Sequence, residues 1–236
     1  MRRDDIISYA EIVKQEGAPI QRGMTFGGGR RYSVLLASSR RGAPYRDHFD
    51  SETGLLTYEG HDVNKSEQVP DPKSVDQPMN LPSGKLTENG KFLRAVLDYK
   101  DGLRKPELVR VYEKIDSGVW SDKGFFELVD AEIVHDGKRN VFRFRLRPVE
   151  RRAFRRSEIQ DFTRLIPTEV KVEVWRRDKG RCVLCGSAKH LHYDHHIPFS
   201  KGGASVTAQN IRLLCAKCNL SKGAKIVCIS FVGLAA

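Results

Sequence analysis

The sequence predicts an α+β protein in two units: a curled, mostly antiparallel β-barrel, followed by a much smaller unit stapled by cysteines. Two observations predict this arrangement. Residues 1–150 contain several strand-like segments with no helix of crossover length between the later ones, which favours antiparallel pairing. The last third holds two Cys-x-x-Cys pairs at a spacing typical of a metal-bound fold. With 236 residues, the chain is long enough for one large domain or two modest ones.

The N-terminal elements follow from the hydrophobic pattern. Apolar residues at helical spacing predict a helix over residues 4–15, which ends at Gly17. Buried strands are predicted over residues 32–37 and 55–58. Residues 68–90 are rich in Pro, Asp, Ser and Asn and predict a long loop.

The pattern then changes to a short helix and three strands. The helix is predicted over residues 90–99, and the strands over residues 108–112, 125–134 and 140–148. In the last strand apolar residues alternate with arginines, so one side should pack a core and the other should present a basic row. The glycine run 27–29 does not predict a phosphate-binding loop, because no Gly-Lys-Ser/Thr follows it.

Metal-dependent hydrolytic chemistry is indicated within and just after the cysteine pairs. Four thiolates, with 29 residues between the two pairs, can close a tetrahedral zinc site. Asp194 and Asn219 offer a carboxylate and an amide oxygen for a hard cation, and His195 can take a proton from water. A purely structural zinc ribbon that binds DNA without cutting is the alternative, but a plain ribbon needs no Asp-His insert.

Four segments of the C-terminal part carry a family resemblance. They are Trp175-Arg-Arg-Asp-Lys-Gly-Arg-Cys182, Leu191-His-Tyr-Asp-His-His-Ile-Pro-Phe-Ser-Lys-Gly-Gly203, Asn210-Ile-Arg-Leu-Leu-Cys215 and Cys218-Asn-Leu-Ser-Lys-Gly223. Over about residues 166–224 the chain resembles the HNH, or ββα-metal, nuclease family of the type with a four-cysteine zinc site. The match is long, and few of its positions could hold any residue at all.

The HNH resemblance implies a role for each of these residues. Asp194 and Asn219 hold one catalytic cation, Mg²⁺ or Mn²⁺, which stabilises the leaving oxygen and the charge on the phosphate. His195 is the general base, and Asn210 orients the loop that carries it. Lys222 follows Asn219 by one helical turn and could touch the DNA phosphate, although a solvated lysine is the simpler expectation. The structural Zn²⁺ is held by Cys182, Cys185, Cys215 and Cys218.

The charge distribution points to nucleic acid. The chain carries a formal +11, and residues 151–236 hold 16 Lys/Arg against 6 Asp/Glu, whereas residues 1–150 hold 25 against 24. A basic C-terminal part favours binding to a phosphate backbone. Residues 151–165 predict a basic linker helix whose paired arginines are expected to contact DNA phosphates: Arg151, Arg152, Arg155 and Arg156.

Cysteine use and hydropathy predict the compartment. Four of the five cysteines stand at metal spacing, which argues against disulfides, and Cys228 has no partner left. The charged N-terminus does not read as a signal peptide, and no apolar run approaches the ~20 residues that span a membrane. A soluble protein of the bacterial or archaeal cytoplasm, without membrane contact, is expected.

Short motifs in residues 18–152 carry a second resemblance. They are Tyr32-Ser-Val-Leu-Leu, Tyr45-Arg-Asp47, Tyr58-Glu-Gly60, Asp76-Gln77, Asn89, Val109-Arg-Val-Tyr112 with Trp120, and the strand at 125–131. Together they resemble the SRA (SET and RING associated) domain, which binds modified cytosine in DNA. The fold implied is an SRA-like curled antiparallel β-barrel.

The SRA resemblance implies a pocket for a base flipped out of the duplex. Tyr45 and Tyr58 stack on its two faces, and Asp47 accepts a hydrogen bond from the cytosine amine, with Asp50 as the second choice. Gly60 leaves room for the substituent at C5. The alternative is that both tyrosines are ordinary barrel residues with buried rings.

The sequence therefore predicts an SRA-like domain over residues 1–150, the linker helix, and an HNH domain over residues 166–236. The predicted activity is a modification-dependent endonuclease that flips 5-methyl- or 5-hydroxymethylcytosine out of double-stranded DNA and cuts nearby. A homodimer is expected, because one HNH site cuts one strand. The alternatives are a homing or mobile-element HNH nuclease that reads sequence, and a reader of modified DNA that does not cut.

Overall fold

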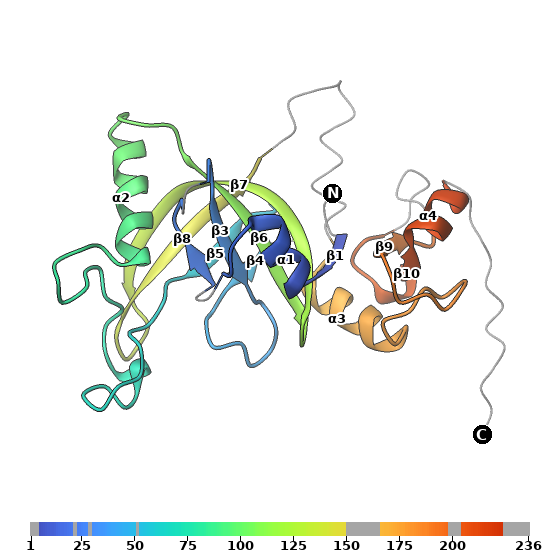
Figure 1. The fold of residues 1–236 in the computed structure, drawn as a ribbon, viewed down its shortest axis with the longest axis horizontal. Helices are drawn as coiled ribbons and strands as arrows, with labels where there is room; N and C mark the ends of the chain where they lie inside the picture. The colour runs from blue at the N-terminus through green and yellow to red at the C-terminus, as the bar shows by residue number, and fades with distance from the viewer. Residues whose placement is uncertain are drawn as a thin grey trace.

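The computed structural model describes residues 5–20, 23–27, 30–50, 52–149, 166–197 and 204–223. Figure 1 shows a strongly curled sheet next to a smaller unit that contains α3, α4, β9 and β10. The predicted linker helix lies outside the described residues, as do its arginines Arg151, Arg152, Arg155 and Arg156 and the fifth cysteine, Cys228. Among the described residues, every helix is too short or too polar to span a lipid bilayer.

The segment predicted as one N-terminal helix forms a strand and a helix. Strand β1 (Asp5–Ser8) precedes helix α1 (Tyr9–Glu16). The Ser8 hydroxyl accepts a hydrogen bond from the Glu11 N–H, and the Glu11 carboxylate accepts one from the Ser8 N–H. This reciprocal capping box fixes the first turn of the helix at residue 9. The helix prediction was therefore wrong for residues 5–8, because helical spacing and strand alternation are hard to distinguish over so few residues.

The rest of the N-terminal sheet follows the predicted order of strands. Its strands are β2 (Met24–Thr25), β3 (Ser33–Ala37), β4 (His48–Phe49), β5 (Leu56–Glu59), β6 (Glu107–Asp116), β7 (Val119–His135) and β8 (Asn140–Pro148). Among the described residues, β3 and β6 form the one parallel pair. The sheet branches at β7, which pairs with β1, β6 and β8.

The expected barrel is an open, curled sheet in the described part of the chain. The short strand β2 ends the main pairing path, β4 ends the branch that leaves β7 through β8 and β5, and each pairs with a single neighbour. Strands of two residues offer few backbone groups with which to close a ring. The fold class is confirmed as α+β, with a mixed sheet in place of a closed barrel.

One helix covers the main core of this sheet. Helix α2 (Glu88–Lys100) begins at the N-cap Thr87, whose hydroxyl accepts a hydrogen bond from the Gly90 N–H, and it lies along one side of the sheet (Figure 1). Its buried residues Phe92 and Val96 pack in one cluster with apolar side chains of β5 to β8. The loop before it contains only the short helix η1 (Pro72–Ser74).

Strand β8 alternates as predicted, but two of its three arginines pair with acidic side chains. The apolar side chains Phe142, Phe144 and Leu146 are buried in the main core. On the other face, Arg145 pairs with two acidic side chains of β7, and Arg147 pairs with a third. These cross-strand pairs offset the positive charge of this face.

The smaller unit has its own core. It consists of α3 (Thr168–Arg177), β9 (Leu191–His195), η5 (Ala208–Asn210), β10 (Ile211–Cys215) and α4 (Ala216–Lys222). Strands β9 and β10 form an antiparallel pair in which Asp194 lies opposite Arg212. Its cluster of buried apolar side chains is separate from the main core. The domain boundary near residue 150 stays a prediction.

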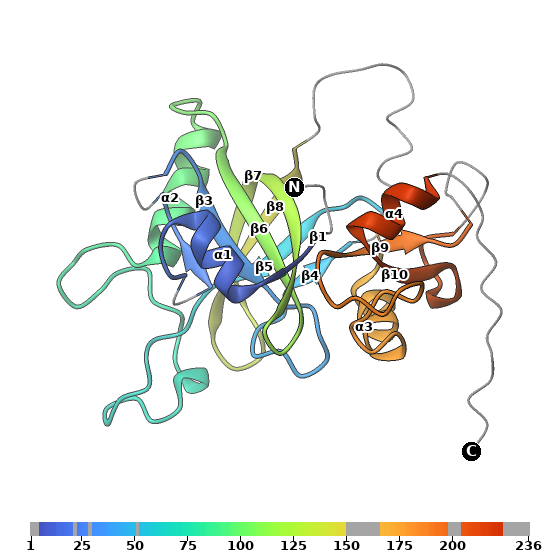
Figure 2. The same ribbon diagram turned by 45° about the vertical axis from the view of Figure 1, so that its right-hand side comes forward.

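Strand β1 connects the two units, as Figure 2 shows from a second direction. It pairs with β7 on one side, and its Asp5 pairs with His192 of β9 on the other. The two isoleucines of β1 point into different cores: Ile7 packs in a small cluster beneath α1, and Ile6 packs against the core of the smaller unit. One ten-stranded sheet therefore runs through the whole described chain.

Candidate nuclease and base-binding sites

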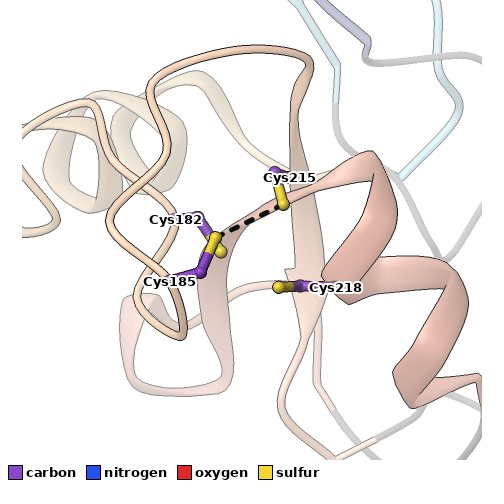
Figure 3. A group of neighbouring side chains, drawn as sticks. All are labelled: Cys182, Cys185, Cys215 and Cys218. Carbon is purple, nitrogen blue, oxygen red and sulfur yellow. Dashed lines mark hydrogen bonds between the residues drawn. The ribbon is translucent and has the colours of Figure 1, made fainter.

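The four cysteines converge at one end of the smaller unit (Figure 3). Cys182 and Cys185 lie in the turn after α3, Cys215 ends β10, and Cys218 lies in the first turn of α4. All four sulfur atoms lie within 4.8 Å of one another, and the sulfurs of Cys185 and Cys215 are 3.6 Å apart. In a tetrahedral Zn–S₄ site the sulfurs are about 3.8 Å apart, given Zn–S bonds of about 2.3 Å. The cluster could therefore hold a zinc ion with small adjustments.

Backbone hydrogen bonds help to shape the cysteine cluster. The Gly186 N–H donates to the Cys182 carbonyl, and the Val183 N–H donates to the Leu213 carbonyl of β10. When several thiols lie close together without a cation, a negative charge on one thiolate makes deprotonation of its neighbours less favourable. Hydrogen bonds that the Cys218 thiol donates to the Cys215 and Cys185 sulfurs raise the pKa of Cys218 to about 12. A bound cation would remove this competition, so the donor set fits a zinc tetrathiolate.

Strand β9 positions the predicted catalytic pair. Asp194 and His195 are its last two residues, and both are partly buried. The Lys222 ammonium lies 2.5 Å from Asp194 Oδ2 and also bonds the His195 carbonyl. The Arg212 guanidinium lies 3.4 Å from the same carboxylate oxygen. Two positive charges therefore converge on the Asp194 carboxylate.

Lys222 is not the solvated lysine that was the simpler expectation. Only 4% of it is exposed, and its ammonium points into the site. Helix α4 brings it there, and Asn219 lies on the same helix one turn earlier, partly buried. Burial and the positive charges of Arg212 and Lys222 lower the pKa of the neighbouring His196.

The histidine is oriented by a residue that the sequence did not single out. His195 Nε2 lies 2.8 Å from the hydroxyl of Ser205, which is buried. Asn210 contacts both Ile197 and Ala204: its side chain accepts from the Ile197 N–H at 2.8 Å and donates to the Ala204 carbonyl at 2.9 Å. Such bonds fix the direction of the imidazole ring.

The oxygen donors suit a hard divalent cation. Asp194 supplies a carboxylate and Asn219 an amide oxygen, which are ligand types that Mg²⁺ and Mn²⁺ accept. The Lys222 ammonium lies beside Asp194 Oδ2, which shows that a positively charged group can approach this oxygen. The donor types of Asp194 and Asn219 are therefore those that a catalytic Mg²⁺ or Mn²⁺ would use.

The predicted base-binding residues converge around a histidine that the motifs did not include. The rings of Tyr45 and His61 stack with centroids 5.3 Å apart and planes 14° apart. The Tyr58 hydroxyl lies 2.9 Å from His61 Nε2 and donates to the Gly23 carbonyl at 3.2 Å. Tyr58 is 1% exposed, whereas Tyr45 is partly exposed and carries the Lys73 ammonium 4.1 Å from its ring centroid.

Asp47 and Gly60 lie in the same region of the fold. Asp47 Oδ2 accepts from the Ser38 N–H at 2.8 Å, and Oδ1 accepts from the Glu59 N–H at 3.1 Å. Burial raises the pKa of Asp47 to about 7, although the two backbone bonds oppose the shift. A Cβ atom at Gly60 would come within 2.7 Å of the side-chain oxygens of Gln77 and Asn89. Close packing of these protein groups is enough to require glycine there.

Asp50, the second choice for the cytosine amine, is placed differently. Its carboxylate accepts from the N–H groups of Glu52 and Thr53 in the exposed turn after β4, and these bonds lower its pKa. The structure therefore favours Asp47 over Asp50 as the buried acceptor.

Comparison with known proteins agrees with the site in the smaller unit. Residues 182–225 match the sequence model of the HNH endonuclease family. This range contains the four cysteines, Asp194, His195, Asn210 and Asn219. By this match, residues 182–225 form an HNH domain. No curated protein matches the chain.

Solved structures resemble the chain at low identity. The SUVH5 SRA domain in complex with hemimethylated CG DNA is 20% identical, with a TM-score of 0.43, and the match covers 63% of this chain and 89% of that one. The SUVH5 SRA domain bound to fully hydroxymethylated CG DNA is 18% identical, with a TM-score of 0.44 and the same coverage. The modification-dependent TagI restriction endonuclease is 16% identical, with a TM-score of 0.42 over 93% of this chain and 76% of that one.

Proposed function

We propose that this chain is a modification-dependent DNA endonuclease, in which the N-terminal sheet holds a modified cytosine and the HNH domain hydrolyses a nearby phosphodiester bond. The observation that carries the nuclease half is the Asp194–His195 pair on β9, inside the range that matches the HNH endonuclease family. The modified-base half is supported by Tyr45, Tyr58 and Asp47, which lie around one region of the sheet.

In the proposed hydrolysis of the phosphodiester bond, each side chain of the site has one role. His195 takes a proton from the attacking water, and the Ser205 hydroxyl at Nε2 holds its ring in place. A cation bound by Asp194 and Asn219 would stabilise the charge that develops on the phosphate and the leaving oxygen. Lys222 and Arg212 place positive charge beside Asp194, where a DNA phosphate would arrive. Asn210 keeps the segment after His195 in position.

The substrate and assembly form the rest of the proposal. The base is 5-methyl- or 5-hydroxymethylcytosine, flipped from double-stranded DNA, and the basic linker arginines bind the backbone. Two copies act together, because one HNH site cuts one strand. The protein works in the cytoplasm of a bacterium or archaeon.

A plasmid cleavage panel tests this function. Plasmids with unmodified, 5-methyl-, 5-hydroxymethyl- or glucosylated cytosine are incubated with the protein and Mg²⁺ or Mn²⁺. We expect cleavage of at least one modified plasmid and little of the unmodified one. Equal cleavage of all four would favour a sequence-reading HNH nuclease, and binding without cleavage under every metal would favour a non-cutting reader.

His195→Ala tests the catalytic assignment in the same panel. Loss of the general base should reduce cleavage by a factor of about 10² or more, while DNA binding and thermal stability stay near those of the parent. The matched control is His135→Ala, an exposed histidine at the end of β7. If His195→Ala still cuts at the parent's rate, His195 is not the base.

A further inference from the structure

We propose that the His61 imidazole fills the base-binding slot of the free protein and has to swing out before a flipped base can stack on Tyr45. This inference rests on the proposed function. It starts from the position of the ring, which stacks on Tyr45 in a near-parallel arrangement and bonds the Tyr58 hydroxyl. These are the two side chains between which the modified base is proposed to bind. An imidazole is a flat ring with polar edges, so it occupies this place much as a pyrimidine would.

The ring is enclosed on a further side by backbone. A Cβ atom at Gly23 would lie 3.3 Å from both Cε1 and Nε2 of His61, and 3.4 Å from the Tyr58 hydroxyl. Gly23 has a φ of 69°, which favours glycine, and it lets the chain pass close to the ring. A base could not share this space with the imidazole.

The backbone of His61 is fixed, so the side chain is the part that can move. Asn89 binds both sides of this residue: its Oδ1 accepts from the His61 N–H and its Nδ2 donates to the His61 carbonyl, each at 2.8 Å. Gln77 donates to the carbonyl of the preceding Gly60 at 2.7 Å. Rotation about the side-chain bonds would therefore open the slot without moving β5 or α2.

The contacts that His61 loses when it swings out determine how strongly a base must bind in order to displace it. Entry of a base breaks the stack on Tyr45 and the hydrogen bond to Tyr58, and a well-fitting base must replace both. The net value of a protein hydrogen bond is equivalent to about a three- to tenfold change in affinity. His61 thus lowers the affinity for every flipped base, and a base with few compensating contacts is rejected.

Binding measurements with His61→Ala test this inference. The His195→Ala background prevents cutting, and the probes are duplexes of one sequence with a single 5-methylcytosine, a single 5-hydroxymethylcytosine or no modification. We expect His61→Ala to bind the preferred modified duplex about three- to tenfold more tightly. Affinity for the unmodified duplex, which rests on backbone contacts, should stay within about twofold. A residue with a merely structural role would not give tighter binding when removed.

Two further variants make the result specific. His61→Phe keeps a flat ring against Tyr45, so it should not bind more tightly than the parent. His135→Ala, which changes an exposed histidine far from the slot in the chain, should match the parent. Thermal unfolding of each variant identifies any that fails to fold. If His61→Ala does not fold, the affinity of His61→Phe is compared with that of the parent.

The possible results distinguish a failure of the His61 inference from a failure of the proposed function. If the parent prefers modified DNA but His61→Ala binds it equally or more weakly, this inference is overturned and the histidine contacts the base or only supports the fold. Tighter binding by both His61→Ala and His61→Phe would also overturn it, because ring volume would not matter. A parent without any preference for modified DNA overturns the proposed function, and this inference with it.

Discussion

Asp47 is a buried carboxyl group at the junction of three segments. Its two oxygens join the N–H of Ser38, just after β3, to the N–H of Glu59, at the end of β5. Two backbone bonds do not fully replace the water that burial removes, so the pKa rises to about 7. The Glu59 carboxylate adds to this shift. Asp47 therefore holds its proton in the folded protein at pH values where it is ionised in the unfolded chain.

This shift makes a prediction about stability and pH. Because the folded pKa lies above the unfolded value of 3.8, the folded state binds the proton more tightly, and stability should fall as pH rises from about 4 to about 7. The loss between pH 5 and pH 8 is on the order of 2–3 kcal/mol. Asp47→Asn should remove this part of the pH dependence in urea unfolding, whereas the exposed Asp101→Asn should keep it. Parallel pH profiles for the parent and Asp47→Asn would contradict the assignment.

Sequence analysis identified the site residues that lie close together in the chain. It missed the residues that only the folded structure brings to the site. Asp194 and His195 are adjacent, and each cysteine pair spans four residues, so the short motifs carry the pattern. Ser205, Arg212 and His61 reach their partners only through strand pairing and loop closure. A lone serine after an alanine, or a histidine after a glycine, gives no comparable signal. The side chain of Lys222 was placed in solvent for the same reason.

Strand β1 shows the corresponding limit for secondary-structure elements. The predicted strands and the helix before them were largely recovered, because each has a long run of apolar periodicity. Residues 5–8 were assigned to a helix, since only the tertiary partners β7 and β9 distinguish Ile6 and Ile7 of a strand from those of a helix. The open sheet was missed because the pairing of its short end strands is invisible in the sequence.

The cysteine cluster joins the turn after α3 to the start of α4. We predict that Cys182→Ser loses the bound zinc and unfolds the segment around β9 and β10, because a structural zinc supplies folding free energy directly. Zinc content and limited proteolysis measure this: cleavage should begin within residues 166–223. Cys228→Ser, which changes the fifth cysteine, should keep one zinc and the parent's resistance. A folded, active Cys182→Ser protein without zinc would contradict the stapling role.

At the scale of the whole molecule, a buried ion cluster joins the two units. Glu113 of β6 is fully buried, and its carboxylate accepts a hydrogen bond from Thr168, the first residue of α3. The same carboxylate pairs with the ammonium of Lys171, 3.3 Å away, and with that of Lys123, 3.5 Å away. The Lys171 carbonyl in turn accepts from the Tyr193 hydroxyl on β9, at 3.1 Å. One carboxylate thus connects the N-terminal sheet to α3 and, through Lys171, to β9, the strand that carries Asp194 and His195.

Removal of this charge should uncouple the two units. Glu113→Gln removes the carboxylate that pairs with the ammonium groups of Lys123 and Lys171, and breaking a buried ion pair costs about 3–5 kcal/mol. The chain has two tryptophans, Trp120 in β7 and Trp175 in α3, so Trp120→Phe and Trp175→Phe variants each leave a probe in one unit. In the parent both probes should report one urea midpoint, because the cluster and β1 couple the units. In Glu113→Gln the Trp175 midpoint should fall below that of Trp120.

The control for this experiment is Glu132→Gln, a glutamate of β7 that pairs with Arg145 on the exposed face. Partly exposed pairs contribute at most about 1 kcal/mol, so its two midpoints should remain coincident. Coincident and unshifted midpoints in Glu113→Gln would mean that the units are held together by β1 and apolar contacts alone. Separate midpoints already in the parent would mean that the units fold independently. Only coincidence in the parent and separation in Glu113→Gln show that the buried carboxylate fixes the smaller unit relative to the N-terminal sheet.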